Sequence, residues 1–179
     1  MTNLKDRIIN KQMLAKITVY SVSTKLMKNG IITAHPDVDI NGADLLAIMK
    51  VSDGAKFARI QCKGRTIKRK NRTCSISIKK QYVIGAFTCL LYLRYLQDNT
   101  DHWFCFFVHD IKSRKDLWKE DSKNYKLTLY GNTFQSKFDL FYFSNSRVDA
   151  LKKIIENSDV DKEFYYVFGK GEITLPSFS

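Results

Sequence analysis

Three polar side chains between positions 44 and 63 have the types and spacing that metal-assisted phosphodiester hydrolysis needs. Asp44 opens an apolar run, LLAIMKV, and Gln61 and Lys63 lie two residues apart in the next run, FARIQCK. Such hydrolysis requires oxygen ligands for Mg²⁺ and a cation beside the attacking water or the developing charge. The aspartate and glutamine can supply the oxygens, and the lysine can supply the charge. The pattern therefore predicts a hydrolytic metal site.

Two strands joined by a hairpin must bring these side chains together. We expect strands over residues 44–51 and 57–63, connected by the turn Ser52-Asp53-Gly54. Alternate side chains of a strand project to one face, so Gln61 and Lys63 should point together while Cys62 points into the core. An antiparallel pairing brings Asp44, at the beginning of one strand, close to Lys63 at the end of the other. A second interpretation is purely structural, with Asp44 capping a turn beside a surface glutamine and lysine.

A basic segment, KGRTIKRKNR at residues 63–72, begins at the candidate lysine. A charge run of this kind can be a solvated loop, but its position favours a basic hairpin that grips phosphate groups. The candidate DNA-binding residues are Arg65, Lys68, Arg69, Lys70 and Arg72, followed after the next strand by Lys79 and Lys80.

The composition favours a polyanionic partner. Thirty Lys and Arg residues against eighteen Asp and Glu give a net charge of +12 over 179 residues, which points first to nucleic acid and second to an acidic membrane surface. No stretch approaches the roughly 18 uncharged apolar residues of a membrane span, and the first residues do not read as a secretory signal. We therefore expect a cytoplasmic protein without a membrane partner. The four cysteines stand singly, which predicts reduced thiols rather than a zinc site.

The remaining pattern predicts an α/β fold whose mixed central sheet is flanked by helices. A single domain should comprise a core over about residues 12–115 and a C-terminal α+β extension over about 116–179 on the same core. The other expected elements are helices at 12–29, 80–97 and 147–157, and strands at 31–34, 73–78, 103–108, 125–130, 137–143 and 163–168.

The two strands carry a resemblance to a known superfamily. The sequence GADLLA at 42–47, followed by RIQCKGR at 59–65, resembles the PD-(D/E)XK nucleases of restriction-endonuclease-like fold, over roughly residues 12–110. The resemblance implies that Asp44 binds a metal and that Gln61 replaces the usual acid. It also implies that Lys63 polarises the water or steadies the phosphate, and that the backbone carbonyl of Cys62 faces the metal. The cofactor it implies is Mg²⁺, with Mn²⁺ as a substitute.

Four further residues are candidate accessories to this site. Gln12 is the nearest polar substitute for the glutamate that many resolvase-like members place on their first helix. Asp37 and Asp39 could bring a second carboxylate from the loop before Asp44, and His35 lies near the same loop.

The sequence therefore leads to two hypotheses about function. The first is a Mg²⁺-dependent endonuclease of restriction, homing or junction and repair type. Its substrate is double-stranded DNA, and it works as a homodimer or higher homo-oligomer because one site cuts one strand. The C-terminal extension would then serve DNA recognition or oligomerisation. The second is a nuclease-fold protein with weak or absent catalysis that acts as a nucleic-acid-binding module.

Overall fold

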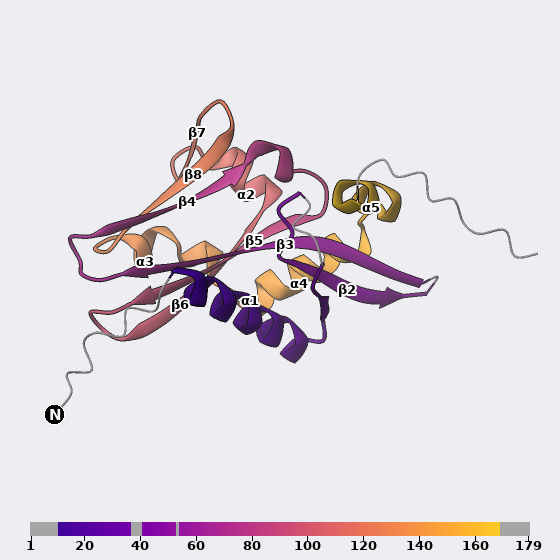
Figure 1. The fold of residues 1–179 in the computed structure, drawn as a ribbon, viewed down its shortest axis with the longest axis horizontal. Helices are drawn as coiled ribbons and strands as arrows, with labels where there is room; N and C mark the ends of the chain where they lie inside the picture. Colours follow the sequence, from indigo (N-terminus) through magenta and orange to yellow (C-terminus); the bar gives the residue numbers. More distant parts are fainter. Residues whose placement is uncertain (1–10, 37–40, 53, 169–179) are drawn as a thin grey trace, which may run out of the picture.

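A computed structural model describes residues 11–36, 41–52 and 54–168 of the chain (Figure 1). Helix α1 (Lys11–Lys28) leads into an antiparallel meander of β1 (Ile32–Ala34), β2 (Leu45–Val51) and β3 (Gly54–Ile67). β3 then pairs in parallel with β5 (Phe87–Tyr95), which pairs antiparallel with β6 (Thr100–Phe107). The result is a five-stranded mixed sheet of order β1-β2-β3-β5-β6.

A second sheet draws on both halves of the chain. β4 (Thr73–Lys79) leaves the first sheet after the turn that follows β3, and the short 3-10 helix η2 (Lys80–Tyr82) leads back toward β5. β4 pairs antiparallel with β8 (Asn124–Tyr130), which also pairs with β7 (Trp118–Glu120), giving the order β4-β8-β7. The last third of the chain is thus hydrogen-bonded to a strand that lies between β3 and β5 in the sequence.

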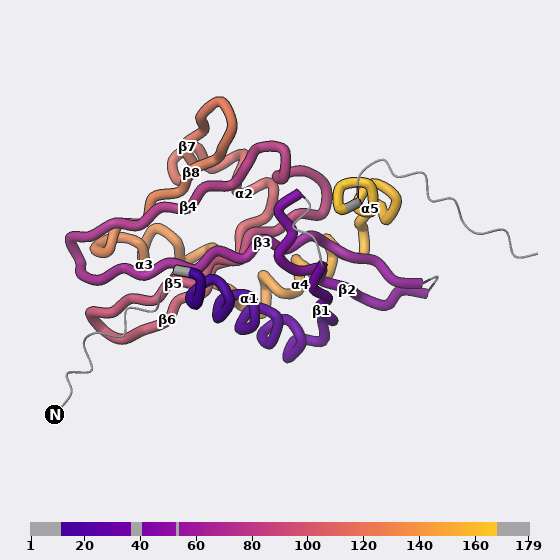
Figure 2. Tube along the Cα trace, in the orientation of Figure 1, coloured from indigo at the N-terminus to yellow at the C-terminus, as the bar shows by residue number. Residues whose placement is uncertain are grey.

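The two faces of the five-stranded sheet are covered differently. Apolar side chains of α1 and α4 (Asn145–Glu156) pack on one face, in a cluster that includes Leu26, Ile60 and Leu151. The second sheet packs on the other face, where β5 contributes Cys89 and Leu91. In Figure 2, β4, β7 and β8 lie above β3, and α1 lies below it. The shorter helices are α2 (Val108–Ser113), α3 (Phe134–Lys137), η3 (Asp139–Phe141) and α5 (Val160–Phe168).

The structure confirms the predicted fold class, a mixed central sheet flanked by helices. It also confirms helices at α1 and α4 and the strands β1, β2, β3, β4, β6 and β8, each close to its predicted range. β3 is longer than predicted, because it continues to Ile67 while still paired with β5.

Three predicted elements were wrong. The expected helix over 80–97 is η2 followed by β5, a central strand whose residues 87–93 are all buried. Such a strand is apolar on both faces, so its sequence lacks the alternation that distinguishes it from a buried helix. The expected strand at 137–143 contains the last residue of α3 and then η3, and the expected strand at 163–168 belongs to α5. Within the described residues, no helix combines the length and apolar composition that a bilayer crossing requires.

Candidate metal and nucleic-acid site

Asp44 stands immediately before β2 and contacts β3 through both its backbone and its side chain. Its N–H donates to the carbonyl of Ile60 at 2.9 Å, and its Oδ2 accepts from the N–H of Cys62 at 2.6 Å. The β2–β3 ladder begins with Leu45 opposite Ile60. Just beyond that pair, the Asp44 carboxylate replaces a backbone carbonyl as the acceptor for the Cys62 N–H. In an antiparallel ladder the N–H and C=O of one residue face the same edge. The Cys62 carbonyl therefore faces the edge at which Asp44 lies.

Gln61 is buried and has an unsatisfied side-chain oxygen. Its side chain is 6% exposed, and among the described residues Oε1 has no hydrogen-bond partner. Asp44 is hydrogen-bonded to both sequence neighbours of Gln61, the Ile60 carbonyl and the Cys62 N–H, so position 61 of β3 lies beside Asp44. A buried carbonyl without a partner costs about 1–3 kcal/mol. A cation or a hydrogen-bond donor bound to Gln61 Oε1 would remove that penalty.

The donor set fits a hard divalent cation. A carboxylate carries about four lone-pair sites on two oxygens, and a hydrogen bond from Cys62 occupies one of them, so the residue type is compatible with a metal ligand. Together with Gln61 Oε1 and the Cys62 carbonyl it offers oxygen ligands only, which Mg²⁺ prefers. Within the described part of the chain, no group of three or more His, Cys, Asp or Glu residues is placed to hold a metal. A magnesium ion here would complete its coordination with water or phosphate, as this ion commonly does.

Lys63 and Arg65 follow Gln61 on the same face of β3, since alternate residues of a strand share a face. Arg65 is committed to the protein, because its Nε donates to the carbonyl of Ser75 on β4 at 2.7 Å. Lys63 is half-buried and lies two residues from Gln61. It is thus the cation of β3 best placed to act beside an ion held by Gln61.

Cys62 has a structural side chain. The thiol packs against the cluster under α1 and α4, on the face opposite Gln61. Burial raises the pKa of the Cys62 thiol well above its ordinary value, and the neighbouring Asp44 carboxylate raises that pKa further. A neutral thiol is a poor nucleophile, so only the backbone of Cys62 has a role at the site.

The predicted basic residues fall into two separate groups. Lys68, Arg69, Lys70 and Arg72 are exposed around the turn between β3 and β4, whereas Lys79 and Lys80 stand at the far end of β4. Seven strand residues span roughly 20 Å, so the two groups do not form one patch. The Lys79 end is the one near Asp44. The Lys79 ammonium lies 5.4 Å from the centre of the Tyr82 ring, and that ring lies against Gly42.

Lys80, a candidate DNA-binding residue, is held in an ion pair within the protein. Its ammonium forms an ion pair of 2.6 Å with Glu120 on β7, which also pairs with Lys115 at 2.6 Å. The two lysines hold the pKa of Glu120 down to about 2, so its carboxylate is charged throughout the neutral range. Lys80 therefore contributes less positive potential to a DNA surface than Lys79 does.

The accessory residues are less closely tied to the site. His35 is exposed, with its ring 5.9 Å from that of Tyr20 on α1, and Gln12 is exposed in the first turn of α1. Asp37 and Asp39 lie outside the described residues. Sequence analysis missed the buried pair of Arg59 and Glu163, whose Nε and Oε2 lie 2.9 Å apart beside the site.

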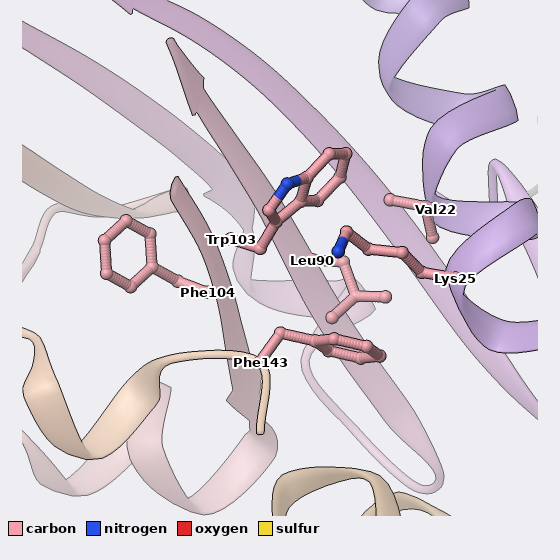
Figure 3. A pocket seen from close by; sticks show the side chains of 6 residues that line it. All are labelled: Val22, Lys25, Leu90, Trp103, Phe104 and Phe143. Atoms are coloured by element: carbon pink, nitrogen blue, oxygen red, sulfur yellow. The ribbon is translucent and has the colours of Figure 1, made fainter. Parts of the chain in front are cut away.

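A narrow crevice lies on the opposite face of the sheet, where α1 meets β5, β6 and the segment before α4 (Figure 3). Its walls are apolar, and the ammonium of Lys25 lies 5.0 Å from the centre of the Trp103 ring. The side chains that line it are Val22, Lys25, Leu90, Trp103, Phe104 and Phe143. They carry no oxygen donor, so the crevice is not a second candidate metal site.

Comparisons with known proteins gave a structural likeness but no match in sequence. No model of a protein family matches the sequence, and no curated protein matches it. Among solved structures, the chain is similar to Archaeoglobus fulgidus Hjc, a Holliday junction resolvase from an archaeal hyperthermophile. The TM-score is 0.42 at 15% sequence identity, and the match covers 76% of this chain and 95% of that chain.

Proposed function

We propose that this chain is a metal-dependent endonuclease that hydrolyses phosphodiester bonds of double-stranded DNA. The observation that carries the proposal is the buried Oε1 of Gln61, which has no hydrogen-bond partner among the described residues, on a strand that Asp44 contacts at Cys62 and that carries Lys63 two residues further on. A folded chain tolerates an unsatisfied buried oxygen most readily where a ligand satisfies it in use. The three side-chain types are those of hydrolytic metal chemistry.

Each residue has a distinct role in this proposal. Bound Mg²⁺, or Mn²⁺ in its place, supplies Lewis-acid polarisation of the phosphate and activation of water. Asp44 provides the negative charge that holds the ion, and Gln61 Oε1 and the Cys62 carbonyl provide neutral oxygens. Lys63 orients the water or stabilises the charge that develops on the phosphate. Because Gln61 is neutral, the site should hold the ion less tightly than one with two carboxylates.

The DNA would lie across the Lys79 end of β4 and reach the basic hairpin. Lys63 and Lys68 are separated by five positions along extended backbone, or roughly 17 Å. At about 3.4 Å per base pair, that distance corresponds to roughly five base pairs of DNA between the metal site and the phosphates nearest to Lys68. The exposed Lys68, Arg69, Lys70 and Arg72 would bind phosphates there. Paired cutting of both strands would require a homodimer or higher homo-oligomer, with residues 116–179 serving recognition or assembly.

A second candidate function is DNA binding without cleavage. It is favoured by one observation: the described residues hold no group of three or more His, Cys, Asp or Glu placed to bind a metal, and the Asp44 carboxylate is already hydrogen-bonded to Cys62. In that case Asp44 would serve as a cap for the β3 backbone, and the positive surface alone would be functional.

A cleavage assay distinguishes the two functions. Purified protein is incubated with supercoiled plasmid, linear duplex and a four-way junction, each with Mg²⁺, Mn²⁺ or EDTA. The matched control is Asp44→Asn, since an amide oxygen can still accept from the Cys62 N–H while the charge is lost. We expect metal-dependent cleavage by the natural chain and none by Asp44→Asn. Binding of all three DNAs without metal-dependent cleavage would instead support the binding module.

A further inference from the structure

A buried ion pair fastens helix α5 to β3 next to the candidate site. Arg59 and Glu163 are 0% and 2% exposed, and Arg59 Nε donates to Glu163 Oε2 at 2.9 Å. The second oxygen of Glu163 accepts from the N–H of Ala86 at 2.6 Å. A buried pair is stable only when its remaining hydrogen-bonding capacity is satisfied. Here that capacity is used on neighbouring backbone.

The remaining donors of Arg59 fix the segment between η2 and β5. Its Nη2 donates to the carbonyl of Ile84 at 2.6 Å, and its Nη1 donates to that of Tyr82 at 3.4 Å. Gly85, in the same segment, has φ +58, and a side chain there would collide with Glu163. Residues 82–86 are therefore fixed between β3 and α5, and with them the Tyr82 ring.

The same helix also reaches the turn that delivers Asp44. The side-chain amide of Asn41 donates to the carbonyl of Tyr166 on α5. Asn41 and Gly42 both have left-handed backbones, with φ +54 and +75, and the Tyr82 ring fills the space where a Gly42 side chain would lie. This sharp turn ends two residues before the candidate ligand, and it is supported by α5 and by Tyr82.

We propose that these contacts form an α5 clamp, consisting of the Arg59–Glu163 pair and the Asn41–Tyr166 bond, that sets the position of Asp44 against β3. Helix α5 contacts β3 at Arg59, two residues before Gln61. The same helix contacts the preceding turn at Asn41, three residues before Asp44. Asn41 and Glu163 are thus positioning residues, since they act on the site through the backbone. The consequence for metal affinity rests on the proposed function, whereas the positioning itself does not.

Hydrogen exchange at the Cys62 amide tests the clamp, because that N–H is donated to Asp44. The variant Asn41→Gly keeps the left-handed backbone accessible and removes the bond to Tyr166. Asn99→Gly is the matched control, because Asn99 also has a left-handed backbone, at φ +52, but lies in the turn between β5 and β6. We expect exchange at Cys62 to accelerate about three- to tenfold in Asn41→Gly and to stay unchanged in Asn99→Gly, with core amides of β5 unchanged in both.

The Glu163→Gln variant provides a second line of test. It keeps an acceptor for Ala86 but leaves the buried guanidinium of Arg59 without its charge partner. We expect the same local acceleration at Cys62, together with weaker Mn²⁺ binding in both variants. Unchanged exchange at Cys62 in Asn41→Gly, or an equal acceleration over the whole sheet, would overturn the clamp. Local acceleration in a protein that binds no Mn²⁺ would leave the clamp standing and refute the nuclease proposal.

Discussion

The carboxylate of Asp44 accepts a 2.6 Å hydrogen bond from the backbone N–H of Cys62, at the point where β2 begins and β3 continues. This bond gives Asp44 a structural role that is independent of any metal. It also holds the carboxylate at the edge of β3 that the Cys62 carbonyl faces, where we propose that a cation binds. Variants can separate the two roles, because an asparagine keeps an acceptor and loses the charge.

Loss of the Asp44 charge should abolish cleavage while the fold persists. We expect Asp44→Asn to lower the cleavage rate by about 10²-fold or more, the scale on which groups that stabilise transition-state charge act. Lys63→Met should lose cleavage to a similar extent and retain most DNA affinity. Cleavage is measured in single turnover, and affinity is measured by fluorescence anisotropy in EDTA. Full activity in either folded variant would refute the catalytic assignment.

Replacing Gln61 with leucine should raise the stability of the fold and weaken metal binding. Gln61→Leu removes a buried oxygen without a partner, so we expect the free energy of unfolding to rise by about 1 kcal/mol in urea titrations. The same variant should need a higher metal concentration for cleavage or lose activity. Gln61→Glu should lower the metal concentration required, because it adds a carboxylate. A Gln61→Leu protein that is destabilised, with unchanged metal dependence, would show that the oxygen has another partner.

The basic hairpin should contribute to DNA binding without contributing to folding. Its backbone is held by Gln97, whose side chain accepts from the Lys70 N–H at 3.1 Å, and by Gly131, which donates to the Arg72 carbonyl at 3.0 Å. Replacing Lys68, Arg69, Lys70 and Arg72 with glutamine should reduce the slope of log affinity against log salt by about 0.9 per lost phosphate contact. The urea midpoint should stay the same. An unchanged salt slope would place the DNA elsewhere.

Release of Lys80 from Glu120 should strengthen DNA binding. Because the pKa of Glu120 is lowered to about 2, its carboxylate remains charged at every pH used for binding, and only substitution frees the lysines. Glu120→Gln should therefore tighten binding at low salt and steepen its salt dependence. Asp116→Asn serves as the control, because it also removes one negative charge, but Asp116 is paired with Arg114 and not with Lys80. Equal effects of the two variants would indicate net charge rather than Lys80.

The four thiols should react slowly while the protein is folded. Burial raises the pKa of Cys74 to about 11 and that of Cys89 to about 12, and it also raises the pKa values of Cys62 and Cys105. A raised pKa lowers the thiolate fraction, so at pH 8 about one Cys74 side chain in a thousand is ionised. Reaction with a disulfide reagent at pH 8 should be slow until urea exposes all four. A fast phase in the native protein would contradict this.

The sequence predicted that Asp44 lies close to the residues around Cys62 because that geometry is local. Asp44 and Cys62 are joined by one tight hairpin, so register and alternation of side chains follow from a short stretch of chain. The α5 clamp could not be predicted in this way. Arg59 and Glu163 are 104 residues apart, and the predicted strand over 163–168 placed Glu163 in the wrong kind of element.

The same limit applied to the centre of the five-stranded sheet. The apolar run at 87–93 fits both a buried helix and a strand covered on two faces, and only the pairing with β3 and β6 decides between them. The predicted strand at 73–78 did separate Lys79 from the basic hairpin, because the two lie at opposite ends of β4. The partner strand of β4, which is β8, was beyond prediction because it lies about 50 residues further along the chain.

Paramagnetic broadening by Mn²⁺ reports directly on whether a metal binds at Asp44. In the amide spectrum of isotope-labelled protein, we expect substoichiometric Mn²⁺ to broaden the signals of Asp44, Gln61 and Cys62 before any others. Asp44→Asn should remove this selective broadening while leaving the rest of the spectrum intact. Sharp signals at all three residues in the natural chain, with broadening confined to exposed carboxylates such as Asp116, would contradict a metal site at Asp44.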